Sequence, residues 1–107
     1  MTTAPLTQGM MEVRLPIREF VARGAPTSAT ATRIGPHGIE VSCSHATSAR
    51  YAWLGMQLPD GAAIKALVEV IGVLGAGEGV RMLARFKHLF PSDRRALERA
   101  LAARMAA

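Results

Sequence analysis

The sequence contains little of what disulfide-bonded, secreted or membrane-spanning proteins require. Its single cysteine, Cys43, excludes a disulfide framework within the chain. No apolar run reaches the roughly 18 residues needed to span a bilayer. The longest candidate, residues 66–76, is interrupted by Glu69 and by glycines. The N-terminus has no basic region followed by an apolar block, so we expect no signal peptide and, by default, a cytoplasmic location.

Signatures of catalysis are also scarce. His37, His45 and His88 are scattered along the chain, and no Gly-x-Ser-x-Gly motif, Walker loop or dinucleotide fingerprint occurs. Cys43 and His45 lie two residues apart on a predicted strand and therefore share a face, but zinc sites normally use three or four protein ligands. We therefore predict no catalytic residues, no metal site and no enzymatic activity, and we interpret Cys43 as a small core residue.

What the sequence does contain is enough apolar material for one globular domain. Half of its 107 residues are hydrophobic, and a chain of this length buries roughly two-thirds of the surface that its unfolded form exposes. The net charge is +5 at pH 7 with neutral histidines. Most of the excess comes from arginine, which suits planar anionic partners. A solvated basic surface explains the charge equally well.

Alternating apolar and polar residues predict a series of short strands followed by one helix. The expected strands cover residues 11–23, 27–34, 38–43, 51–58, 62–74 and 79–89, and the expected helix begins at an N-cap, Ser92. Residues 62–74 have partly helical spacing, but their β-branched side chains favour a strand. Residues 1–10 are expected to form a flexible tail ahead of one domain over residues 11–107.

Details of this pattern predict how the strands are arranged. Pro16 cannot donate a hydrogen bond to a neighbouring strand, so the first strand lies at a sheet edge or contains a bulge there. Gly35 and Gly38 supply backbone freedom for a sharp turn, in which Pro36 fixes one φ. The helix has an apolar face that packs inward, made by Leu97, Ala100, Leu101 and Met105. The fold class is therefore mainly β: a small six-stranded antiparallel barrel with a C-terminal helix over one opening.

Two arginines on the first strand are candidate ligand-binding residues. Arg14 and Arg18 are four residues apart, so in a regular strand both guanidinium groups face the same side. An arginine fork can bind a phosphate or the edge of guanine, and it can stack on a base. The alternative is a pair of edge-strand charges that discourages aggregation.

A small basic barrel can also bind nucleic acid, with retention on DNA or RNA that depends strongly on salt. The chain has one tryptophan, one tyrosine and three phenylalanines, which leaves few aromatic side chains for base stacking. We assign Trp53 and Phe86 to the core. Nucleic-acid binding is therefore not the function that we favour.

The order of elements, together with three local patterns, resembles the PilZ family. Nearly the whole chain, from about Val13 to Met105, is covered, and the second half matches best. The patterns are Tyr51-Ala-Trp-Leu-Gly-Met-Gln-Leu-Pro-Asp-Gly, the apolar run of residues 64–73, and Gly79-Val-Arg-Met-Leu-Ala-Arg-Phe followed by a helix. The resemblance implies a PilZ-like barrel of six strands closed by the final helix.

The resemblance also implies a ligand, the bacterial second messenger cyclic di-GMP. Family members hold it with Arg-x-x-x-Arg and with a downstream Asp/Asn-x-Ser-x-x-Gly. The second motif falls on residues 33–38 and keeps only Gly38, because Arg33 stands where an acceptor belongs and Gly35 replaces the serine. Arg14 and Arg18 fit the first motif by spacing. In another register, Arg14 takes the second arginine position and Met10 the first.

Three functional hypotheses follow. The first is a non-catalytic PilZ-like adaptor that acts through protein contacts in bacterial motility, pilus or polarity regulation, with weak or no cyclic di-GMP binding and no cofactor. The second is a cyclic di-GMP receptor that uses Arg14, Arg18 and Arg33, with Gly38 in its site. The third is the nucleic-acid binder. We favour the first, because each lost charged or hydrogen-bonded contact costs about 1.5–3 kcal/mol.

Overall fold

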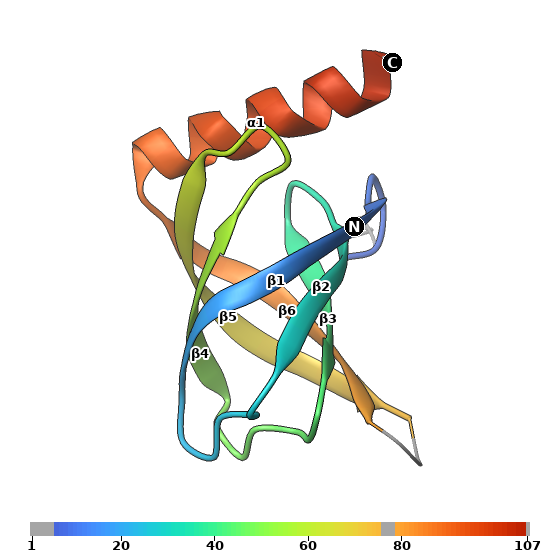
Figure 1. Ribbon diagram of the computed structural model, residues 1–107, viewed down its shortest axis with the longest axis vertical. Helices are drawn as coiled ribbons and strands as arrows, with labels where there is room; N and C mark the ends of the chain where they lie inside the picture. The colour runs from blue at the N-terminus through green and yellow to red at the C-terminus, as the bar shows by residue number, and fades with distance from the viewer. Residues whose placement is uncertain (1–5, 76–78, 107) are drawn as a thin grey trace, which may run out of the picture.

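The computed structural model describes residues 6–75 and 79–106. Six antiparallel strands close into a barrel in the order β1-β2-β3-β6-β5-β4, and a helix crosses one end of it (Figure 1). The elements are β1 (Met11–Val21), β2 (Ala29–Ile34), β3 (Gly38–Cys43), β4 (Tyr51–Gln57), β5 (Ala63–Leu74), β6 (Val80–Leu89) and α1 (Pro91–Ala106). The predicted barrel with a C-terminal helix is confirmed, and residues 62–74 do contain a strand.

β1 closes the barrel because it changes partners along its length. Its first half pairs with β2 as far as Pro16 opposite Thr30, and its second half pairs with β4 from Ile17 opposite Met56. The register shifts twice, between Glu12 and Leu15 and between Ile17 and Glu19. The expectation of a bulge near Pro16 is therefore confirmed. The alternative of a sheet edge is wrong, because β1 is hydrogen-bonded within a closed barrel.

The turn between β2 and β3 needs its glycines for space rather than for backbone freedom. Gly35 donates its N–H to the Gly38 carbonyl at 2.9 Å, and neither residue has a positive φ. A Cβ on Gly38 would lie 2.6 Å from the carbonyl oxygen of Ala84, and one on Gly35 would lie 3.0 Å from the Met10 side chain. Close approach of neighbouring segments, and not a left-handed conformation, selects glycine here. The predicted reason was wrong.

The barrel interior is filled mainly by aliphatic side chains. The largest fully buried side chains are Ile34, Ile39, Leu54, Met56, Met82, Leu97, Val41 and Val68. Cys43 and Phe86 are buried with them, as predicted. Trp53 is different: it alternates with the inward-facing Ala52 and Leu54, so it lies on the outside of β4. Its assignment to the core was wrong.

The helix covers one opening of the barrel with its predicted apolar face. Leu97 is fully buried, and Ala100 and Leu101 are nearly so. Polar contacts fix the helix at three places along its length. The Lys65 N–H donates to Asp93 at 3.1 Å, Arg94 donates to the Pro36 carbonyl at 3.4 Å, and Arg104 donates to the Glu12 carbonyl at 3.3 Å.

The helix begins slightly before its predicted cap. Pro91 is its first residue, and the Phe90 carbonyl accepts a hydrogen bond from Arg94 at 2.9 Å. Pro91 suits the first helical position because its missing N–H would have no intrahelical partner there. Ser92 is therefore inside the helix and is not its N-cap. Asp93 lies in the first turn, as expected, and its carboxylate accepts a hydrogen bond from the backbone N–H of Lys65 on β5.

Some predictions fall on residues outside the described part of the chain. These are residues 1–5 of the predicted tail, residues 76–77 of the turn before β6, and the side chain of Met105. Within the described part of the tail, Met10 donates its N–H to Thr7 at 3.2 Å. No helix among the described residues has the length and apolar character needed to cross a membrane.

Replacing Leu97 by alanine should destabilise the fold by about 2–5 kcal/mol, because it empties a fully buried position between the helix and the barrel. Urea unfolding followed by circular dichroism measures this change. Leu74→Ala is the matched control. Leu74 is 69% exposed, so the same deletion there should change stability by less than about 0.5 kcal/mol. Equal effects of the two variants would contradict the proposed packing of α1.

Candidate functional site

Two of the four predicted ligand residues line an open hollow on the outside of β1, β2, β3 and β6. Arg14 and Arg33 line it together with Arg81, and its volume is about 510 Å³. Thr30, Thr32 and Ser42 also line it, as do two acidic residues, Glu12 and Glu40. Sequence reasoning missed Arg81. Its place follows from pairing, because Arg81 lies opposite Ser42 on β3.

Arg33 is flanked by carboxylates from both neighbouring strands. In the sheet register it lies between Glu12 on β1 and Glu40 on β3. Its Nε is 3.9 Å from a carboxylate oxygen of Glu40. That Nε is buried and has no hydrogen-bond partner among the described residues. Thr32 donates to the other carboxylate oxygen of Glu40 at 2.9 Å. Arg33 therefore has one long ion pair within the sheet, to Glu40, and two acidic residues line the hollow together with the three arginines.

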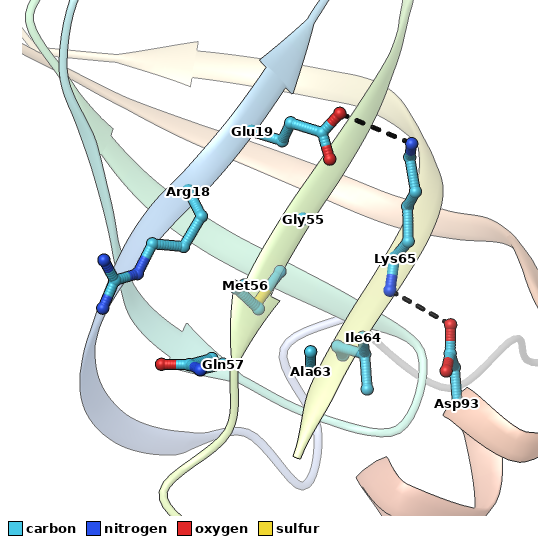
Figure 2. Close-up of a pocket in the computed structure, with 9 residues that line it drawn as sticks. All are labelled: Arg18, Glu19, Gly55, Met56, Gln57, Ala63, Ile64, Lys65 and Asp93. Carbon is cyan, nitrogen blue, oxygen red and sulfur yellow. Dashed lines mark hydrogen bonds and ion pairs between the residues drawn. The ribbon is translucent and has the colours of Figure 1, made fainter. Parts of the chain in front are cut away.

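Arg18 lies in a different hollow, between β1, β4 and β5. Figure 2 shows its side chain pointing away from Glu19, which turns toward Lys65. The Lys65 Nζ is 3.5 Å from the Glu19 carboxylate. Arg14 and Arg18 are both exposed, but between them β1 leaves β2 and joins β4. The structure therefore brings Arg14 and Arg33 together and does not bring Arg18 to them.

Gly38 has a structural place rather than a ligand-facing one. It is buried, and its Cα packs against the Ala84 carbonyl and the side chain of Leu6. Because a Cβ would overlap both groups, the fold itself explains why glycine is kept at this position. Survival of this part of the motif therefore does not by itself indicate a nucleotide site.

A second charged cluster, missed from the sequence, is centred on Glu69. Glu69 is 6% exposed; its carboxylate accepts a hydrogen bond from Arg50 Nε at 2.8 Å and forms ion pairs with Arg50 at 2.7 Å and Arg85 at 3.3 Å. The hydrogen bond from Arg50 outweighs desolvation and holds the pKa of Glu69 below its ordinary value. The cluster joins the residue before β4 to β5 and β6, so it stabilises the sheet. Its three members, Glu69 and the two arginines, come from separate segments, which is why no local motif indicates the cluster.

Cys43 and His45 do not form a shared site. Cys43 is buried, and this burial raises the pKa of its thiol. His45 lies in an exposed loop, with its Nε2 3.1 Å from the Ala25 carbonyl oxygen. Among the described residues, no group of three or more His, Cys, Asp or Glu side chains is placed to hold a metal ion.

Comparison with known proteins supports the fold. No protein-family model matches this chain, and no curated protein is significantly similar to it. Among solved structures, the chain is similar to the Bacillus subtilis inhibitor of motility (MotI/DgrA), with a TM-score of 0.74 and 17% sequence identity. The similarity covers 91% of this chain and 49% of that one, so the chain spans about half the length of that protein. At this identity the likeness shows a shared PilZ-like fold.

Replacing Glu69 by glutamine should make stability less dependent on pH in the acid range. Because its pKa is lowered in the folded protein, the carboxylate stabilises the fold above its ordinary value of 4.5, and this contribution disappears as the pH falls below it. Urea unfolding should therefore show a deficit for Glu69→Gln at about pH 7 that shrinks at about pH 3.5.

The control for this experiment is Glu98→Gln, which removes the same charge on an exposed face of α1. It should differ little from the unmodified protein at either pH. A Glu69→Gln deficit that is constant across this range would show that the carboxylate charge is not what stabilises the cluster.

Proposed function

We propose that this protein is a non-catalytic regulator of bacterial motility, pilus function or polarity, which acts through contacts with another protein and binds cyclic di-GMP weakly or not at all. Support for the regulatory role comes from the shared fold with an inhibitor of motility. Support for weak or absent cyclic di-GMP binding comes from the arrangement of the predicted ligand residues on the barrel.

The observation that carries the proposal is the surroundings of Arg33. Cyclic di-GMP has two phosphates and two guanines, so its site needs converging cations and acceptors for the guanine edges. Here Arg33 is a donor flanked by Glu12 and Glu40, and Arg18 lines a separate hollow. The ion pair of Arg33 with Glu40, the missing guanine acceptor and the separation of Arg18 from Arg14 and Arg33 each remove a contact that would recognise the dinucleotide.

The second candidate function is a cyclic di-GMP receptor that uses Arg14, Arg18 and Arg33, with Gly38 beside them. Its support is the hollow itself, in which Arg14, Arg33 and Arg81 outnumber the two acidic residues. If this candidate is correct, replacing either Arg14 or Arg33 by alanine should weaken nucleotide binding about tenfold or more, since each removes a charged contact.

Calorimetric titration with cyclic di-GMP distinguishes the two candidates. We expect no heat of binding, or a dissociation constant well above about 10 μM, because two or three contacts of roughly 1.5–3 kcal/mol each are missing. The control is Arg95→Ala, an exposed arginine on α1 outside the hollow, which should change nothing. Sub-micromolar binding that Arg14→Ala abolishes and Arg95→Ala preserves would replace the proposed function with the receptor.

The regulatory role predicts a motility phenotype. Deleting the gene in its host should change swimming in soft agar or movement over a surface, and the unmodified gene should restore the original behaviour. A variant with Arg14→Ala and Arg33→Ala should restore it too, since we place no required ligand in that hollow. Unchanged movement in every assay after deletion would argue against a role in motility or pilus control.

A further inference from the structure

Three of the few aromatic side chains lie outside the barrel on one face. Tyr51 and Phe90 are 43% and 50% exposed, and Trp53 lies between them on the outside of β4. Only Phe86 is buried in the core, with Phe20 packed against it. The core is otherwise aliphatic, so these three large side chains are not explained by packing of the interior. Exposed tyrosine and tryptophan are characteristic of binding surfaces.

The sheet register aligns this face across four strands. Val21 on β1 pairs with Trp53 on β4, Trp53 pairs with Leu67 on β5, and Leu67 pairs with His88 on β6. Phe90 follows β6 and completes the surface. We define the aromatic face by the following six residues: Val21, Tyr51, Trp53, Leu67, His88 and Phe90.

The rings of the aromatic face hold one another in place. Trp53 and Phe90 are stacked with centroids 6.5 Å apart, and His88 meets the Phe90 ring edge-on at 5.0 Å. His88 also meets Trp53 edge-on at 6.3 Å. A partner that binds here therefore meets rings that are already positioned, which lowers the entropy cost of association.

A small hollow in this face can receive one side chain. Val21, Trp53 and Phe90 form its apolar walls and Lys65 its polar rim, and its volume is about 260 Å³. A space of this size suits one leucine or phenylalanine anchor, as at the centre of protein interfaces. The face also borders exposed cations, namely Lys65, Lys87, Arg50 and Arg85. Lys65 is paired with Glu19, and Arg50 and Arg85 are paired with Glu69, so four cations meet two carboxylates there and Lys87 has no ion pair among the described residues.

The closed barrel limits what kind of partner can bind. β4, β5 and β6 are hydrogen-bonded on both sides beneath the aromatic face, so a partner strand has no free edge to extend there. Recognition must occur through side chains. An amphipathic helix satisfies this requirement, because its own backbone is hydrogen-bonded and it can place an apolar anchor between acidic neighbours.

We propose that the aromatic face is the docking site for an acidic amphipathic helix of a partner protein, whose apolar anchor enters the hollow between Val21, Trp53 and Phe90. The acidic residues of that helix lie against Lys87, which has no ion pair among the described residues, and beside Lys65, whose ion pair with Glu19 is exposed to solvent. This inference rests on the proposed function, since it identifies the surface and the partner chemistry for the protein contacts proposed there.

Trp53 allows a direct test because it is the only tryptophan. The probe is a synthetic helix of about 18 residues, five turns long, with leucines along one face and glutamates beside them. A matched peptide with lysines in place of the glutamates is the charge control. We expect the acidic peptide to shift Trp53 emission to shorter wavelength in a saturable way, and the basic peptide to bind at least about tenfold more weakly.

Substitutions on the protein surface test whether the acidic peptide binds at the aromatic face. Phe90→Ser and Val21→Ser each remove a wall of the hollow. Both residues are at least half exposed, so both variants should fold. Each variant should bind the acidic peptide about tenfold more weakly, or worse. Leu74→Ser, at an exposed apolar residue of the projecting β5–β6 hairpin (Figure 1), is the control and should bind normally. Circular dichroism confirms that each variant is folded.

Several results would overturn the proposal: no response to the acidic peptide, equal binding of both peptides, or unchanged binding by the folded Phe90→Ser variant. A Trp53 shift that appears on raising protein concentration alone would assign the face to a second copy of the chain and would also overturn it. These outcomes are independent of the calorimetric titration, so failure here leaves the proposed function standing, whereas tight cyclic di-GMP binding would reject that function whatever the peptide does.

Discussion

Closure of the sheet through β1 is the constraint on which the rest of the structure depends. One strand supplies hydrogen bonds first to β2 and then to β4, and Pro16, which has no N–H to donate, lies where the change occurs. The two register shifts around it bend the strand enough to join both sides. Once the barrel is closed, its interior requires only compact aliphatic side chains, and its outer surface is left free to differ from region to region.

The same change of partners separates the charges of β1. A regular strand would have presented Arg14 and Arg18 to a single ligand. In the barrel, Arg14 faces a hollow shared with Arg33, while Arg18 faces one bordered by Lys65. Arg33 lies in register with Glu12 and Glu40, and its Nε is 3.9 Å from the Glu40 carboxylate. The PilZ-like barrel shape is thus present with Arg18 separated from Arg14 and Arg33, and the aromatic face becomes the more distinctive surface.

Local patterns were sufficient to predict the elements, because alternation, turn residues and β-branching act over a few residues. The burial of Cys43 and Phe86 follows from the same alternation. The assignment of Trp53 to the core was wrong, because its neighbours Ala52 and Leu54 occupy the inward side of β4. The grouping of Arg14 with Arg81, and the burial of Glu69 between two arginines, depend on barrel stagger and on contacts between distant segments, which no single stretch encodes.

The contact between Arg104, near the end of α1, and the Glu12 carbonyl, near the start of β1, brings both ends of the folded unit to one region. A unit whose last helix is held against its first strand can be joined to neighbouring modules without its strands being pulled apart. The architecture therefore suits modular recombination, in which one barrel is carried intact between polypeptides of different length.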